Sequence, residues 1–142
     1  MDAMTFLREN APLFAGLSDE DLAHLAEQSR LLAFKAGQTV VLKGTTVDGL
    51  HVLVSGAAEV CAKVPNKGVV RVATLAPGDC CGETSIVEMG VANATVKALE
   101  DSTRVLLIPQ EAFRRVLQRD EAFAVRVNTL IRDRRSPSGV PA

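Results

Sequence analysis

The stretch GETSIVEMGVANATVKA, residues 82–98, begins on a glycine and ends in a β-rich run. Gly82 lets the backbone adopt a positive φ angle and approach another group closely, because glycine has no Cβ. The stretch therefore predicts a turn that opens at Gly82 and leads into a strand over Ala94–Leu99.

Further β-rich runs surround this stretch, from about Leu31 to Ile108. Eight of the ten glycines fall in this region and lie between the runs, where tight turns need positive φ angles. Short strands at this spacing predict a sandwich, a barrel or a roll. The predicted strands are Thr39–Lys43, Leu50–Ser55, Ala58–Val64, Val69–Leu75, Ala94–Leu99 and Arg104–Ile108.

Two patterns distinguish these strands. Charged and apolar residues alternate in EVCAKV, residues 59–64, as in a strand with one face in water, and PNKG at 65–68 then predicts a hairpin turn. By contrast, VLV at 52–54 and VLLI at 105–108 are continuously apolar. We therefore expect these two strands to be covered on both faces.

Helical periodicity frames the β region. Residues 4–29 are predicted to form two helical pieces, separated by a stretch that holds Pro12 and Gly16, and Ser18 is the predicted cap of the second piece. Two more helices are predicted after Ile108. We therefore expect one domain over residues 1–135, with helices in 1–30, a β-roll in 31–108, helices in 109–135 and a flexible tail in 136–142.

Composition narrows the class of protein. A chain of 142 residues suits one domain, and a net charge of −1 argues against bulk electrostatic attraction to DNA or anionic lipid. No apolar run approaches the roughly 18 residues of a membrane span, and the first residues lack a secretion signal, so a cytoplasmic location is expected. The three cysteines show no paired spacing that would indicate a disulfide framework or a zinc site.

The segments GETSI at 82–86 and ANATVKA at 92–98 resemble the phosphate-binding cassette of the cyclic nucleotide-binding family, which includes bacterial catabolite activators and protein kinase A regulatory subunits. Four more fragments are similar to this family in order and spacing: FAGLS at 14–18, FKAGQ at 34–38, DGLHVLVSG at 48–56 and LAPGD at 75–79. The resemblance implies a mainly β fold with flanking helices: a double-stranded β-helix, or jelly-roll-like β-roll, with an N-terminal helical segment and two C-terminal helices. At 142 residues, no attached effector domain is expected. The cassette would span residues 81–96. Glycine-rich apolar strands also occur in unrelated rolls such as cupins.

The resemblance also implies a ligand site. It places the backbone amides of Glu83, Thr84 and Ser85 beside the cyclic phosphate, and the Glu83 carboxylate on the ribose 2′-hydroxyl. The family's phosphate-gripping arginine falls at Ala92 in this chain. Loss of such a charged contact, worth about 1.5–3 kcal/mol, weakens phosphate binding by roughly ten- to a hundredfold. The implied ligand-binding residues are Gly82, Glu83, Thr84, Ser85, Ala92, Asn93, Ala94 and Thr95.

Neighbouring residues could offset part of this loss. The Asn93 amide can donate to an anion, Thr95 and Lys97 share its side of a strand, and Arg71 could reach the pocket from a neighbouring strand. The alternative for Lys97 and Arg71 is an outward-facing, solvated charge. Cys81 replaces the family's usual phenylalanine, and packing is the favoured interpretation over redox sensing.

The sequence supports two functions. The first is a stand-alone regulatory module that binds cAMP or cGMP, weakly because of Ala92, and closes the helices after Ile108 over the base. The second is a degenerate domain that pairs as a homodimer or with an unidentified effector protein. Its docking surface would be the apolar face Phe123, Val127, Leu130 and Ile131.

Other functions are not expected. No nucleophile–base pair or metal-ligand cluster stands out, so neither an enzyme nor a metal or other cofactor is predicted. Direct DNA binding is not expected, because a helix-turn-helix and its wing need several tens of residues beyond Ile131. Binding to a membrane is not expected either.

Overall fold

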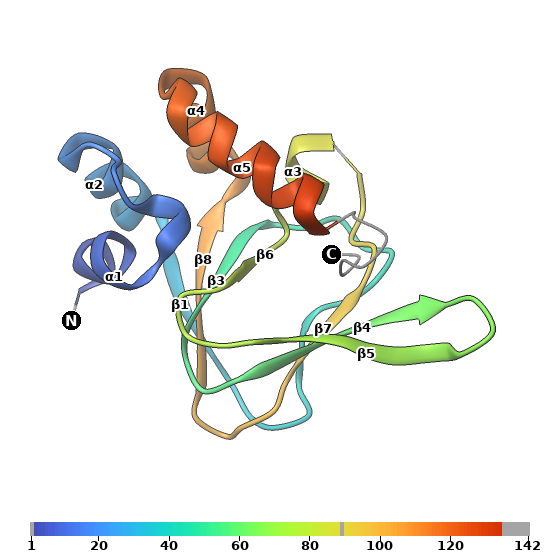
Figure 1. Ribbon diagram of the computed structural model, residues 1–142. Helices are drawn as coiled ribbons and strands as arrows, with labels where there is room; N and C mark the ends of the chain where they lie inside the picture. The colour runs from blue at the N-terminus through green and yellow to red at the C-terminus, as the bar shows by residue number, and fades with distance from the viewer. Residues whose placement is uncertain (1, 89, 135–142) are drawn as a thin grey trace.

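A computed structural model describes residues 2–88 and 90–134 of the chain. It shows two four-stranded antiparallel sheets, one ordered β1-β8-β3-β6 and the other β2-β7-β4-β5, which confirms the predicted β-roll with flanking helices (Figure 1). The strands are β1 (Arg30–Phe34), β2 (Thr39–Val41), β3 (Gly49–Ser55), β4 (Ala58–Val64), β5 (Gly68–Leu75), β6 (Cys80–Cys81), β7 (Thr95–Ala98) and β8 (Thr103–Pro109).

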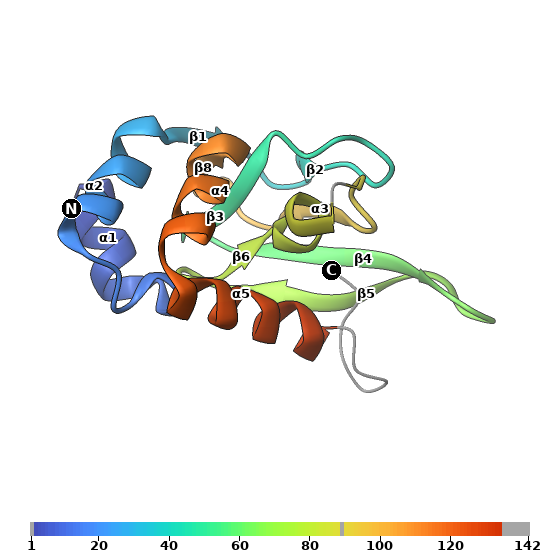
Figure 2. The ribbon, with the colours of Figure 1, turned by 90° about the horizontal axis from the view of Figure 1, so that it is seen from above.

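The longer helices gather on one side of the roll (Figure 2). They are α1 (Ala3–Asn10), α2 (Asp19–Gln28), α4 (Gln110–Arg119) and α5 (Glu121–Arg134), with a 3₁₀ turn η1 (Pro12–Phe14) between the first two. As predicted, Ser18 caps α2, since its Oγ accepts a hydrogen bond from the Asp21 N–H at 3.1 Å. The short helix α3 (Glu83–Glu88) follows β6 directly.

Strands β3 and β8 separate two hydrophobic cores. Leu50 and Ile108 pack with the helices on the outer face of their sheet, while Leu53 and Val105 pack between the two sheets. The strands are therefore covered on both faces, as their unbroken apolar sequence predicts. In β4, by contrast, Val60 is buried and Lys63 is exposed, as expected for a strand with one face in water.

Helix α5 packs its apolar face inside the molecule. Phe123 and Val127 are fully buried, Ile131 is 7% exposed, and the Phe123 ring centroid lies 5.7 Å from the centroids of Phe14 and Phe113. The prediction that Phe123, Val127, Leu130 and Ile131 form a docking surface for a second copy or an effector is therefore wrong. The physical reason is that the N-terminal turn and α4 already cover this face, which buries Phe123, Val127 and Ile131 and leaves Leu130 partly buried.

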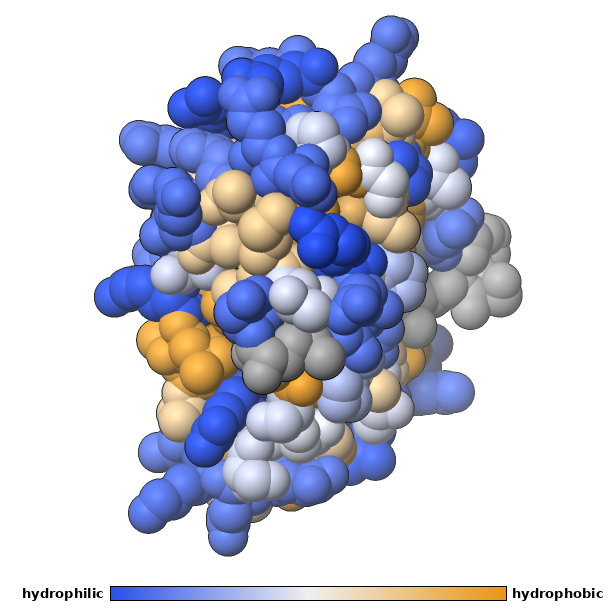
Figure 3. Space-filling view, turned by 90° about the vertical axis from the view of Figure 1, so that its left-hand side faces the viewer, coloured by the Kyte–Doolittle hydropathy of each residue, from blue (hydrophilic) through white to orange (hydrophobic). Residues whose placement is uncertain are grey.

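A limited apolar area remains on the side of α1 and α2, surrounded by polar side chains (Figure 3). A hollow there lies between these helices and the outer face of the β1-β8-β3-β6 sheet, and Phe6, Leu31, Val54 and Leu106 contribute to its lining. Leu31 is 57% exposed. Isolated exposed apolar residues are normal on folded proteins.

The element boundaries differ from prediction at a few places. The predicted strand over 39–43 ends at Val41, and two strands, β1 and β6, were not among those predicted. Strand β6 has only two residues, too few for a periodic signal. In strand β1 no residue is fully buried, so its sequence carries no signal of a core strand. The predicted hairpin between β4 and β5 is present, with Lys67 N–H donating to the Val64 carbonyl at 3.0 Å and Asn66 at φ +70°.

Candidate functional site

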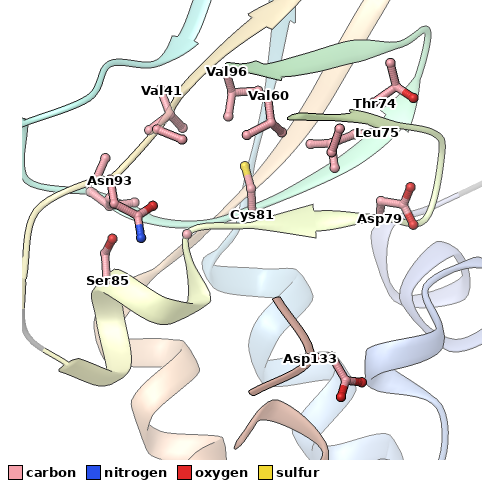
Figure 4. A pocket seen from close by; sticks show the side chains of 15 residues that line it. Val41, Val60, Thr74, Leu75, Asp79, Cys81, Ser85, Asn93, Val96 and Asp133 are labelled. Atoms are coloured by element: carbon pink, nitrogen blue, oxygen red, sulfur yellow. The ribbon is translucent and has the colours of Figure 1, made fainter. Parts of the chain in front are cut away.

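A cavity of about 340 Å³ opens between the β2-β7-β4-β5 sheet and the segment that runs from β6 into α3 (Figure 4). Its volume falls within the range of small-molecule sites. Side chains from both sheets, from α3 and from the end of α5 contribute to its wall. The lining residues are Val41, Val47, Val60, Ala73, Thr74, Leu75, Asp79, Cys81, Gly82, Ser85, Ala92, Asn93, Ala94, Val96 and Asp133.

The turn at Gly82 brings the start of α3 to this cavity. Gly82 has a φ of +98°, and a Cβ there would lie 3.1 Å from the Gly49 carbonyl oxygen and 3.2 Å from Val47 Cγ1. The first internal hydrogen bond of the helix runs from the Ile86 N–H to the Gly82 carbonyl at 3.2 Å. The N–H groups of the residues between them, Thr84 and Ser85 included, therefore have no acceptor within the helix and head its first turn.

The second half of the site is the segment over residues 91–94. The Ala92 N–H donates to the Thr45 carbonyl at 2.9 Å, and the Ala92 carbonyl accepts from the Gly44 N–H at 2.8 Å. These two bonds fix the backbone at position 92 against the loop before β3. Ala92 is 5% exposed and its side chain lines the cavity. A methyl group therefore stands where the family pattern has an arginine.

Five of the eight residues implied by the sequence line the cavity, and three do not. Gly82, Ser85, Ala92, Asn93 and Ala94 contribute to its wall. The Ser85 hydroxyl donates to the Val91 carbonyl at 3.0 Å, which ties α3 to the second half of the site.

The other three residues lie outside the wall. Glu83 and Thr84 are buried, and Glu83 has no exposed surface. Thr95 Oγ1 accepts a hydrogen bond from the Lys43 N–H at 3.1 Å. Their contact with a ligand therefore stays a prediction.

The cations considered as substitutes for an arginine do not line the cavity. Arg71 pairs with Glu59, with Nε 2.8 Å and a terminal nitrogen 2.7 Å from the same carboxylate oxygen. Both residues project from the β4–β5 pair, and neither belongs to the cavity wall. Lys97 is exposed and is likewise absent from the wall. Arg71 and Lys97 therefore match the alternative interpretation of outward-facing charges.

Two carboxylates stand at the cavity instead. Asp79 Oδ2 accepts a hydrogen bond from the Ala76 N–H at 2.8 Å, which closes the turn before β6. Asp133 reaches the site from the last turn of α5 (Figure 4). Among the residues described, those that line the cavity include no lysine, arginine or histidine. The charged side chains of the described part of the wall are therefore both negative.

Sequence reasoning missed much of this wall. Val60 and Val96 could have been assigned, because each takes an inward position in a strand of alternating pattern. Asp133 gave no local signal, since only the packing of α5 brings it to the cavity. Among the described residues no group of three His, Cys, Asp or Glu side chains could hold a metal ion, and no described helix is long and apolar enough to cross a membrane.

Comparison with known proteins gives a consistent match. The family described as cyclic nucleotide-binding domain matches residues 31–120. The chain is 28% identical over 120 residues to cGMP-dependent protein kinase, isozyme 1, from Drosophila melanogaster, covering 82% of this chain and 15% of the kinase. It is 25% identical over 104 residues to a CRP-like cAMP-activated global transcriptional regulator from Mycobacterium tuberculosis, covering 73% of this chain and 46% of the regulator. The chain thus spans less than half the length of these curated relatives.

Solved structures show the same fold. The regulatory domain of Toxoplasma gondii PKA with cAMP superposes with a TM-score of 0.78 at 19% identity, covering 92% of this chain and 47% of that one. The regulatory subunit of a cAMP-independent protein kinase A from Trypanosoma cruzi, bound to guanosine, gives 0.77 at 20% identity, covering 95% and 44%. At these identities the likeness establishes the fold alone.

Proposed function

Because the chain belongs to the cyclic nucleotide-binding domain family, we propose that it acts as a stand-alone regulatory module that binds a cyclic nucleotide, cAMP or cGMP, in the cavity beside α3. One observation carries this proposal: both halves of the cassette, Gly82 with Ser85 and the segment over 92–94, border the same cavity. The proposal includes no catalytic step, and its expected setting is the cytoplasm.

The cyclic phosphate would lie at the first turn of α3. The positive φ angle of Gly82 and the N–H groups of Thr84 and Ser85 favour an anion there. Ala92 offers that anion no charged donor, so we expect binding weaker by roughly ten- to a hundredfold than an arginine would give. Asn93, which is exposed at the edge of the cavity, is the proposed neutral donor.

The ribose contact requires a rearrangement. Glu83 is buried and lies outside the cavity wall, so its carboxylate would meet a ribose 2′-hydroxyl only after the side chain rotates toward the cavity. The proposed output of binding is a movement of α4 and α5, since Asp133 of α5 borders the ligand space. A ligand shifts the equilibrium between two positions of α4 and α5 only by the difference in its affinity for the two conformations. Weak binding of the phosphate would therefore also weaken this conformational response.

A titration with fluorescent cAMP and cGMP tests the proposal. We expect saturable binding with a high dissociation constant in the native chain. Ala92→Arg should lower the dissociation constant by roughly ten- to a hundredfold, because it supplies the missing charged contact. Val125→Arg adds the same charge at an exposed position of α5 outside the cavity wall, and should leave the constant unchanged. Absence of saturable binding in both the native chain and Ala92→Arg would remove the proposal.

A further inference from the structure

The β2–β3 loop, residues 42–48, holds the second half of the site in place. Two backbone hydrogen bonds join it to Ala92, at 2.8 and 2.9 Å. Thr46 of the same loop forms an antiparallel β-bridge with Val91. The segment over residues 91–94 therefore takes its position in the cavity wall from this loop.

The end of the β2–β3 loop contacts the first half of the site. Val47 is 3% exposed, and its side chain lines the cavity. Its Cγ1 atom lies only 3.2 Å from the position that a Cβ would take at Gly82, so Val47 packs against the turn that opens α3. Both halves of the site thus rest on one loop, and their alignment depends on how firmly that loop is held.

Helix α4 holds the loop through its first residue, Gln110. The Gln110 N–H donates to the Asp48 carbonyl at 3.3 Å, and the Gln110 side-chain amide donates to the Val47 carbonyl. The first N–H groups of a helix have no acceptor within the helix, so the bond to Asp48 can form whatever side chain stands at position 110. The bond to Val47, by contrast, requires a side chain that donates. The identity of residue 110 therefore decides whether the end of the loop is fixed to α4.

From these contacts we infer that Gln110 is a positioning residue of the nucleotide site, which acts through the β2–β3 loop. The inference rests on the proposed function, because it concerns binding in the same cavity. Gln110 is half-buried and is not among the residues of the cavity wall, so its effect passes through Val47. Without its hydrogen bond the loop gains freedom, and a ligand then has to order the two halves of the site at a cost in affinity.

Leucine at position 110 tests the inference. Gln110→Leu removes the donor and should raise the dissociation constant of fluorescent cAMP or cGMP by about threefold to tenfold. Without ligand, the same variant should speed amide exchange at Gly44 and Ala92, whose N–H groups donate in the bonds between loop and site. Gln118→Leu makes the same change at an exposed position of α4 outside the cavity wall, and should alter neither quantity. Thermal unfolding checks that each variant retains the fold.

Glutamate at position 110 separates the hydrogen bond from packing. Its carboxylate cannot donate to the Val47 carbonyl, whereas its protonated carboxyl can. Because the carbonyl favours the protonated form, the pKa of this carboxyl should lie above its ordinary value. We expect Gln110→Glu to bind more weakly than the native chain at about pH 7.5 and to approach it toward about pH 5. The native chain, measured at each pH, accounts for shared ionisable groups such as Asp48, His51 and Glu111, and Gln118→Glu should match it throughout.

The outcomes are distinguishable. If both Gln110 variants weaken binding and the glutamate variant recovers at low pH, the inference holds. If cyclic nucleotide binds equally well to the native chain and to both variants, or if the glutamate variant shows no recovery, the inference is wrong while the proposed function stands. If neither the native chain nor Ala92→Arg binds a cyclic nucleotide, the proposed function fails and takes the inference with it.

Discussion

At the scale of single residues, burial sets the chemistry of His51. This residue lies on β3 opposite Cys81, and its Nδ1 is 3.1 Å from the Gly49 carbonyl oxygen. Because a carbonyl only accepts, Nδ1 carries a proton and donates it. Burial lowers the pKa of His51 below its usual value of 6.5, against smaller opposing effects of that hydrogen bond and of Asp48.

This lowered pKa makes folding stability depend on pH. Below about pH 6.5 the unfolded chain binds a proton at His51 more readily than the folded chain does. The contribution of His51 is therefore complete above pH 6.5 and decreases as the pH falls toward the lower pKa of the folded state. We expect the free energy of unfolding, measured with urea from about pH 8 to about pH 5, to decline more steeply in the native chain than in His51→Gln. Equal slopes in the two proteins would contradict the assignment.

Residues of the site differ in how far the sequence reveals them. Gly82 and Ala92 could be assigned to the site from the sequence. A glycine at the start of a helical turn is a local feature, and so is an alanine where the family pattern has an arginine. The position of Glu83 could not, since the rotamer that buries its carboxylate depends on packing around α3. The sequence around Asp79 indicates a turn, and Asp79 does close one. Its place on the cavity wall follows only from the assembled sheets.

At the scale of elements, periodicity identifies an apolar helix face without identifying what covers it. The spacing of Phe123 and Val127 correctly indicated one apolar face on α5, and the same spacing suits a docking surface or an internal contact. The structure assigns it to the internal contact, against Phe14 of η1 and Phe113 of α4. Helix α5 and the turn η1 lie on either side of the whole β-roll in sequence, so no local pattern could pair them.

The packing of α5 gives a stability prediction. Phe123→Ala should lower the free energy of unfolding by about 3–5 kcal/mol, because it removes a fully buried ring and leaves a cavity. Val125→Ala on the same helix should change it by less than about 0.5 kcal/mol, since Val125 is 58% exposed. Urea denaturation measures both. A small loss for Phe123→Ala would mean that α5 does not pack on this core in solution.

At the scale of the whole molecule, polar contacts join the cavity to the N-terminal helices. Arg114 of α4 donates to the Ile86 carbonyl of α3 at 2.9 Å, and Arg126 of α5 donates to the Leu13 carbonyl of η1 at 3.2 Å. Arg119 of α4 lies 3.3 Å from Asp21 of α2. Helices α4 and α5 therefore contact both the ligand-facing helix and the first helices of the chain. A ligand that moves α5 should thus also affect the segment around η1.

Hydrogen exchange measures this connection. Saturating ligand should slow amide exchange in α3, in α5 and in the segment over residues 11–17. Arg126→Leu removes the bond to Leu13 and the cation over the Phe123 ring, so the ligand should still protect α3 but no longer the segment over 11–17. Arg115→Leu, an exposed change on α4, should behave as the native chain does. Undiminished protection of residues 11–17 in Arg126→Leu would show that the signal crosses by another contact, because this side chain is the hydrogen-bonded link between α5 and η1 among the residues described.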